Sequence, residues 1–239
     1  MRHVLYGILR SEADAASRIS ALAAGPQLRL VCDGDLGAAV SLTPDAAAGS
    51  PDPKVHAQIV QALHAVCAVL PMRHGISFDT EAEVREILCE RGGLFRRALD
   101  DLQGCGEMGV RVICRAMTAS PLCAQAAPAA LSPARAYLAA RQSRYAARDA
   151  ARREVSQLAE RIEGAFRGLF AKCKTESFFL RDHPVLSLNF LVRRGETERF
   201  RDAFRRLERR APEKFLLTGP WPPYNFASCE NLIPSRVSW

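Results

Sequence analysis

Short hydrophobic runs recur along the first 42 residues of the chain, and runs of this length are typical of strands. A run at residues 4–9 predicts a first strand, and runs at 28–32 and 36–42 predict two more. Asp33-Gly34-Asp35 lies between the second and third runs, so these two are expected to form a β-hairpin. A short helix is expected between the first two strands, and Gly25-Pro26 would end it.

The pattern then changes to the period of a helix in two segments. Asp52 and Pro53 resemble an N-cap followed by a first-turn proline, and they predict a helix that continues to Leu70. Thr80 and Glu83 form a capping box that predicts the start of a second helix. Its expected core face consists of Val84, Ile87, Leu88, Phe95, Leu99 and Leu102.

The second half repeats this alternation of strands and helices. Residues 107–117 predict a strand, and a helical pattern of about 40 residues follows from Pro133. The apolar stripe of that helix is confined to its second half, so we expect docking at its C-terminal end only. Its first half would project or pack on the other domain. Two strands at 174–181 and 185–193 and an arginine-rich helix follow, and the inward positions expected in that helix are Phe200, Ala203, Phe204 and Leu207.

The order of elements predicts the fold class. From residue 107 the order is strand, helix, strand, strand, helix, strand, which is the ferredoxin-like βαββαβ order. The first 80 residues follow much the same order, with one extra helix after them. We therefore predict an α+β protein of two domains with related layouts, 1–103 and 104–239, the second ferredoxin-like with a long first helix. A single interleaved domain is the alternative.

The most distinctive stretch closes the second domain. Residues 214–218 predict a buried strand, and three of the next five positions are prolines, so the backbone is expected to leave the sheet at Gly219. We call residues 219–226 the proline-aromatic segment. Its aromatic side chains, Trp221, Tyr224 and Phe226, would either clasp the core or form a surface that meets a partner.

Composition narrows the possible functions without selecting one. The chain has 239 residues and a net charge of +7, and most of its positive charge is arginine. A basic surface attracts nucleic acid, anionic lipid or acidic protein. The strand at 107–117 has no aromatic residue, so RNA bases could not stack on it. The arginine-rich helices could still bind RNA or another anion, and this is the alternative function.

No motif indicates catalysis. The sequence has no phosphate-binding glycine loop, no nucleophile elbow and no zinc-protease motif, and its five histidines are scattered. Glu107 is a lone carboxylate, for which a turn or ion-pair role is expected. The eight cysteines form no C-x-x-C pair and are expected to be reduced thiols in the cytosol. We expect no enzyme, no catalytic residue, no cofactor, no metal and no membrane span.

Four stretches taken together resemble one protein family. They are residues 4–8 (VLYGI), 69–75 (VLPMRHG), 102–111 (LQGCGEMGVR) and 217–226 (LTGPWPPYNF). In this order and at these separations they are similar to the gas vesicle GvpL/GvpF accessory proteins, over nearly the whole chain.

The resemblance implies a cytoplasmic, gas-vesicle-associated protein that is not an enzyme. Its implied partners are the shell protein GvpA and other gas vesicle accessory proteins, and nucleic acid is not an expected partner. The implied role is in gas vesicle assembly or nucleation, where the protein would limit aggregation of the shell protein. The residues expected to bind a partner are Trp221, Pro222, Pro223, Tyr224 and Phe226.

Overall fold

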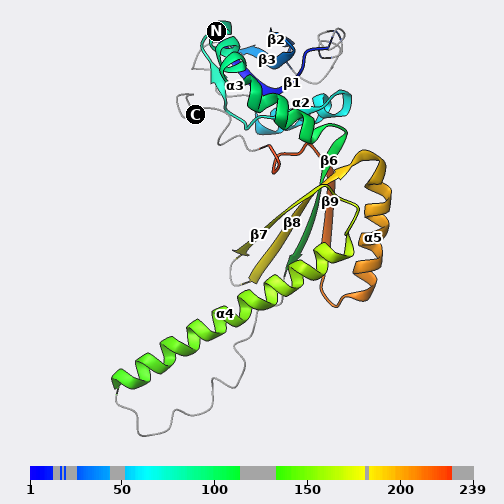
Figure 1. Ribbon diagram of the computed structural model, residues 1–239. Coiled ribbons are helices and arrows are strands. Elements are labelled where there is room, and N and C mark those ends of the chain that lie inside the picture. The colour runs from blue at the N-terminus through cyan, green and yellow to red at the C-terminus, as the bar shows by residue number, and fades with distance from the viewer. Residues whose placement is uncertain are drawn as a thin grey trace. The chain divides into compact units, whose positions relative to one another are not determined.

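The fold is mixed α+β, as predicted, and is built around two sheets (Figure 1). The computed structural model describes residues 1–12, 17, 19, 26–43, 52–113, 133–180 and 183–227. They group into two compact units. The first unit takes its described residues from Met1–Met108, Leu191–Gly195 and Gly219–Trp239, and the second from Gly109–Phe190 and Glu196–Thr218. Neither unit is one continuous segment, and the domain limits 1–103 and 104–239 stay a prediction.

The first unit contains an antiparallel sheet with the strand order β2-β3-β1-β4, to which β5 adds by pairing with β1. Its strands are β1 (Arg2–Arg10), β2 (Leu28–Asp33), β3 (Leu36–Thr43), β4 (Val69–Pro71) and β5 (Ser77–Phe78). The predicted hairpin is confirmed, because β2 pairs with β3 and Asp33 lies opposite Leu36. Gly34 takes the left-handed conformation (φ 58°) that this tight turn requires.

Two helices of the first unit begin at the caps that the sequence predicts. Helix α2 (Pro53–Val66) begins where the Asp52 side chain accepts a hydrogen bond of 2.8 Å from the Lys54 backbone N–H. Helix α3 (Glu81–Leu102) begins where Thr80 Oγ1 accepts one of 3.2 Å from the Glu83 backbone N–H. All six residues of the predicted core face of α3 are buried.

Helix α2 ends four residues earlier than predicted. Cys67 is extended, and Leu70 belongs to β4, where it lies opposite Ile8 of β1. Pairing with a distant strand satisfies the backbone hydrogen-bonding groups of residues 69–71. This pairing decides the conformation there, although the local hydrophobic spacing favours a helix. Most of the helix predicted between residues 11 and 24 lies outside the described residues, which in this range are 11, 12, 17 and 19.

Helices α3 and α2 cover opposite faces of the first sheet, because the strand side chains alternate between two hydrophobic clusters. One cluster joins Leu5 and Ile8 of β1 to the core face of α3. The other joins Val4, Tyr6 and Leu9 to Ile59 and Leu63 of α2. The α3 cluster also contains Cys105, Leu191 and Ala227, so residues from distant parts of the sequence complete this core.

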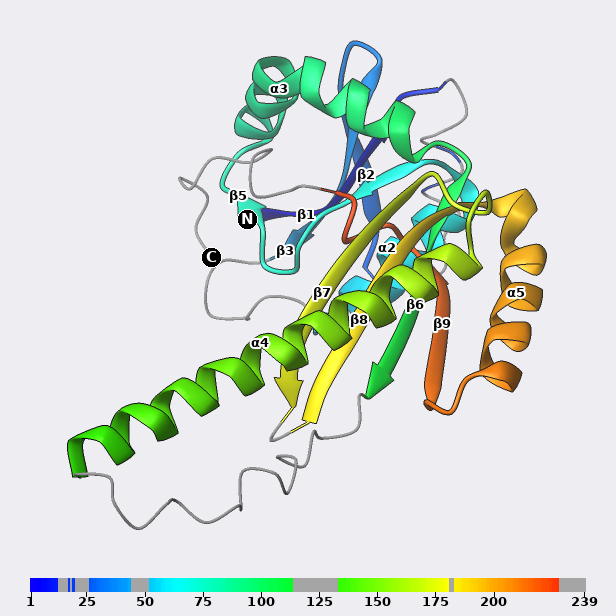
Figure 2. The ribbon, with the colours of Figure 1, turned by 60° about the horizontal axis from the view of Figure 1, so that its bottom comes forward.

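The second sheet has the strand order β7-β8-β6-β9 (Figure 2). Its elements in chain order are β6 (Cys105–Ile113), α4 (Pro133–Ala165), β7 (Lys172–Leu180), β8 (His183–Arg193), the short 3-10 helix η2 (Arg194–Glu196), α5 (Thr197–Arg210) and β9 (Phe215–Trp221). The predicted strand, helix, strand, strand, helix, strand order is confirmed. When strands are counted within each half, both sheets have the order 2-3-1-4, which is the related layout that the sequence predicts.

An aromatic cluster fixes α4 and α5 to one face of this sheet. The Phe166 ring stacks on Phe200 of α5 at a centroid distance of 4.1 Å, and both contact Phe190 of β8. Ile162 and Phe166 are fully buried, whereas Leu138, nearer the start of α4, is 54% exposed. Helix α4 is therefore docked at its C-terminal end, as predicted, and its first turns extend beyond the sheet (Figure 1).

Two element ends in the second half differ from the prediction. Helix α4 ends at Ala165 rather than near residue 172, because a turn at 166–168 places Gly168 in the left-handed conformation (φ 82°). Strand β9 continues to Trp221 instead of leaving the sheet at Gly219, and the Gly219–Pro220 peptide bond is cis. The strand tolerates Pro220 because β9 is an edge strand, where a missing N–H donor interrupts no interior ladder.

Candidate functional site

The proline-aromatic segment belongs to the first unit, where it lies directly against the first residues of β6. Gly219 has a positive φ of 102°, and a Cβ atom built there would lie 2.4 Å from the carbonyl oxygen of Glu107. A Cβ atom on Gly106 would lie 3.2 Å from Pro220 Cβ. Gly219 is therefore needed for this close approach of the two backbones, and a side chain at Gly106 would require Pro220 to shift.

A buried carboxylate anchors the far end of the segment. Glu107 is only 6% exposed, and its two carboxylate oxygens accept hydrogen bonds from Asn225, at 2.9 Å from the backbone N–H and at 2.6 Å from Nδ2. Hydrogen bonds to an ionised acceptor are stronger than neutral ones. The sequence reasoning missed this partner. The available signal was one acidic residue with apolar or small neighbours on both sides, since β6 is buried from Cys105 to Val110.

A compact turn holds the segment between these two anchors. The Tyr224 backbone N–H donates to the Pro222 carbonyl at 2.8 Å. The N–H groups of Phe226 and Ala227 both donate to the Pro223 carbonyl, at 3.1 and 3.0 Å. The backbone is thus fixed by prolines, turn hydrogen bonds and the Glu107 carboxylate together.

The five residues predicted to bind a partner divide into two groups. Pro222 and Pro223 are buried, and Phe226 is partly buried against the α3 core cluster. Trp221 and Tyr224 are 45% and 39% exposed. The inward residues clasp the core and the outward pair is exposed, and binding of a partner by that pair stays a prediction. We call Trp221 and Tyr224 the aromatic pair.

The electrostatics around the aromatic pair keep its phenol neutral. Burial of the hydroxyl end raises the pKa of Tyr224 to about 12, and the negative charge of Glu107 acts in the same direction. A tyrosine with this pKa remains protonated at physiological pH. The aromatic pair therefore presents two large rings and no charge.

The polar groups beside the segment are also fixed by structural contacts. The Arg194 backbone N–H donates to the Gly104 carbonyl at 2.9 Å, and its guanidinium donates to the His64 carbonyl. Burial, together with the positive charge of Arg194, lowers the pKa of His64 to about 4, so this imidazole is neutral. Within the described residues, no group of acidic, histidine and cysteine side chains is placed to hold a metal ion. The arrangement is suited to presenting a rigid surface.

None of the helices in the described part of the chain is both long enough and apolar enough to cross a membrane. The longest, α4, has 33 residues, but charged arginine and glutamate side chains recur through it.

The fold is that of gas vesicle proteins of known structure. It is similar to the crystal structure of the gas vesicle protein GvpF from Anabaena sp. PCC7120, with a TM-score of 0.71, 14% sequence identity, and coverage of 95% of this chain and 97% of that one. It is likewise similar to GvpF from Microcystis aeruginosa, with a TM-score of 0.72, 12% identity, and coverage of 95% and 99%.

The sequence points to the same group of proteins. The model of the gas vesicle synthesis protein GvpL/GvpF family matches residues 3–228, and the chain belongs to this family. It is therefore a gas vesicle protein. The matched range includes the whole proline-aromatic segment and Glu107. No curated protein matches the sequence by direct comparison.

Proposed function

We propose that this gas vesicle protein acts in gas vesicle assembly, as a non-enzymatic factor that binds the shell protein GvpA and other accessory proteins. By covering an apolar surface of the shell protein, it would limit aggregation before that subunit is added to the wall. The contact surface would be the aromatic pair, Trp221 and Tyr224. The observation that carries the proposal is that both rings are exposed although the backbone beneath them is anchored.

Rigid, exposed aromatic side chains are efficient binding groups. A Trp or Tyr ring buries a large area on contact, and binding energy at protein interfaces is concentrated in residues of this kind. The cost of ordering a binding segment is low when its backbone is already fixed. The buried Pro222 and Pro223 and the Glu107–Asn225 hydrogen bonds supply that order before a partner arrives.

A shell protein that polymerises into a β-ribbed wall needs a partner that covers its apolar surface before assembly. Exposed strand edges and apolar surfaces associate with copies of themselves unless they are covered. A contact between these surfaces and the aromatic pair would be mainly apolar, so it would resist salt.

Nucleic-acid binding by the arginine-rich helices is less well supported. Three arginines of α5 are engaged by carboxylates three positions earlier in the chain, which reduces the charge available to phosphate. The β6 strand has no aromatic residue for base stacking.

The experiment is co-purification with GvpA at low and high salt, using the wild-type chain and the double variant Trp221→Ala/Tyr224→Ala. The matched control is Tyr145→Ala, because that tyrosine is 51% exposed but lies on α4. We expect association that survives high salt in the wild type and the control and falls at least about tenfold in the double variant. Circular dichroism confirms that each variant is folded. Unchanged binding by the folded double variant would refute the proposed contact.

A further inference from the structure

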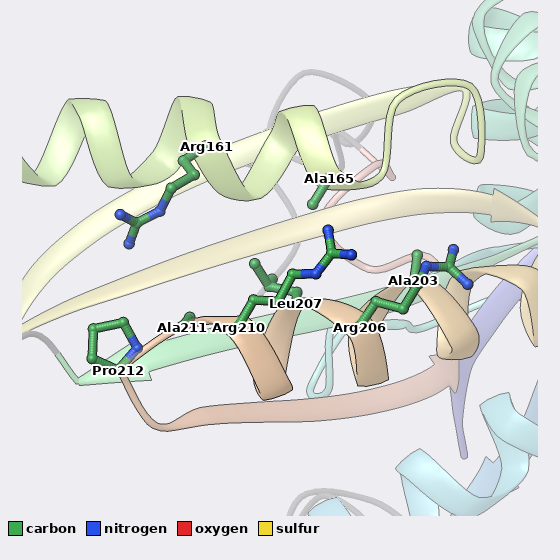
Figure 3. A pocket seen from close by; sticks show the side chains of 8 residues that line it. All are labelled: Arg161, Ala165, Ala203, Arg206, Leu207, Arg210, Ala211 and Pro212. Atoms are coloured by element: carbon green, nitrogen blue, oxygen red, sulfur yellow. The ribbon is translucent and has the colours of Figure 1, made fainter.

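The second unit contains a groove between the C-terminal end of α4 and the C-terminal half of α5 (Figure 3). It encloses a volume of about 360 Å³. Its floor is apolar and is formed by Ala165 of α4, Ala203 and Leu207 of α5, and Pro212. Three arginines, Arg161, Arg206 and Arg210, line it from the two helices.

The charges of these arginines are not equally available. Arg161 forms an ion pair of 2.5 Å with Glu213, which neutralises it. Arg206 and Arg210 have no ion pair with any described residue. Three other arginines of α5 each pair with a carboxylate three positions earlier, as Arg199–Glu196, Arg201–Glu198 and Arg205–Asp202. Nearby carboxylates thus pair with three arginines of α5, whereas Arg206 and Arg210 keep positive charges at the groove that pair with no described carboxylate.

A second hollow extends the groove along α5. It encloses about 310 Å³ and shares Ala165 and Arg206 with the first. It is also lined by Arg167, Leu169, Arg199 and Asp202, and the Asp202 carboxylate pairs with Arg205. Arg199 and Arg210 are eleven positions apart on one helix, which at 1.5 Å per residue is about 16 Å. A groove of this length suits an extended ligand.

We propose that this groove binds an acidic, amphipathic helix of a partner protein. Arg206 and Arg210 are four positions apart, so they lie on one side of α5 about one turn apart. Two carboxylates spaced three or four positions apart on a partner helix match that separation. The aliphatic side chains on the same face would rest on the apolar floor formed by Leu207 and Ala203.

The lining selects this ligand over other anions. A free phosphate would use the arginines but gain nothing from the apolar floor. Single-stranded nucleic acid would require aromatic side chains for stacking, and none of the residues that line either hollow is aromatic. An acidic amphipathic helix uses both parts of the groove. The groove is separate from the aromatic pair, and this proposal does not rest on the proposed GvpA contact.

The test measures fluorescence anisotropy of labelled 18-residue helical peptides titrated with the full chain. Each peptide has leucines on one face and a pair of glutamates spaced by three, four or seven positions, and glutamine versions serve as uncharged controls. The charge-reversal variant is Arg206→Glu/Arg210→Glu. The matched control is Arg209→Glu, because Arg209 shares the last turn of α5 with Arg210 but does not line the groove.

We expect a glutamate peptide with a spacing of three or four to bind, and binding to weaken about tenfold or more in the charge-reversal variant but less than twofold in Arg209→Glu. The neutral variant Arg206→Gln/Arg210→Gln should lie between these, and circular dichroism verifies its fold. The proposal is overturned if no glutamate peptide binds, or if Arg209→Glu weakens binding as much as the groove variant. It is also overturned if polyphosphate or single-stranded RNA binds at this groove and the peptides do not.

Discussion

The carboxylate of Glu107 holds Asn225 by two hydrogen bonds across a separation of 118 positions in the sequence. One bond goes to the backbone and the other to the side-chain amide, so both the path of the chain and the orientation of the residue are fixed. Trp221 and Tyr224 remain exposed on the chain that approaches this contact.

Neutralising that carboxylate should loosen the segment. In Glu107→Gln both Asn225 donors lose their charged acceptor, and we expect the free energy of unfolding to fall by about 1–3 kcal/mol. Denaturant titration measures the change. The control is Glu90→Gln, an exposed carboxylate on α3, which should stay within about 0.5 kcal/mol of wild type. Equal effects of the two substitutions would show that Glu107 does not anchor the segment.

Two glycine substitutions should change stability in opposite directions. Gly219→Ala places a Cβ atom 2.4 Å from the Glu107 carbonyl oxygen at a positive φ, and we expect a loss of roughly 2–3 kcal/mol. Gly93→Ala lies in the exposed interior of α3 with no atom within 4 Å of the added methyl group, and it should gain up to about 1 kcal/mol. Thermal and denaturant unfolding of both variants measure this. A stable Gly219→Ala variant would contradict the close approach.

Acidification should destabilise the fold partly through His64. Its pKa is lowered to about 4 in the folded protein, from an ordinary value of 6.5, so the unfolded chain binds the proton more tightly. The contribution of neutral His64 to the free energy of unfolding is fully present above pH 6.5 and is lost as the pH falls toward 4. The free energy of unfolding then changes by up to about 1.4 kcal/mol per pH unit. In His64→Leu this dependence should flatten. It should not vanish, because burial also lowers the pKa of His56. An identical pH profile of stability in the variant would refute the assignment.

The two ends of α4 should respond differently to truncation of a large side chain. Phe166→Ala, directly after the last residue of α4, removes a fully buried ring that stacks on Phe200, and we expect a loss of about 3–5 kcal/mol. Leu138→Ala, near the start of α4 at a position that is 54% exposed, should change stability by less than about 0.5 kcal/mol. Denaturant unfolding of both variants gives the comparison. A large effect at Leu138 would mean that another surface covers the start of the helix.

The sequence predicts best those elements whose signals are local. Helix α3 begins at its capping box and buries its whole predicted face, because both signals lie within the helix. The end of α2 was misplaced because Leu70 pairs with Ile8, some sixty positions away. The end of β9 was misplaced because the position of that strand at the sheet edge is a property of the whole sheet.

The candidate surfaces show the same limit. The aromatic character of Trp221 and Tyr224 is visible in the sequence, but their exposure depends on buried prolines and on the carboxylate of Glu107. The arginine richness of α5 is equally visible. Only the packing of α4 against α5 reveals that Arg206 and Arg210 line a groove without a described ion-pair partner.

The α3 core cluster is completed by Leu191 and Ala227, so this core cannot be complete until residue 227 has been synthesised. When only β1 through α3 have been translated, the first sheet and helices α2 and α3 still lack core side chains from two later segments. The last of these, Ala227, is translated after all of the second unit's strands and helices. The unit that contains the start of the chain can therefore complete its core only after the elements of the second unit have been made.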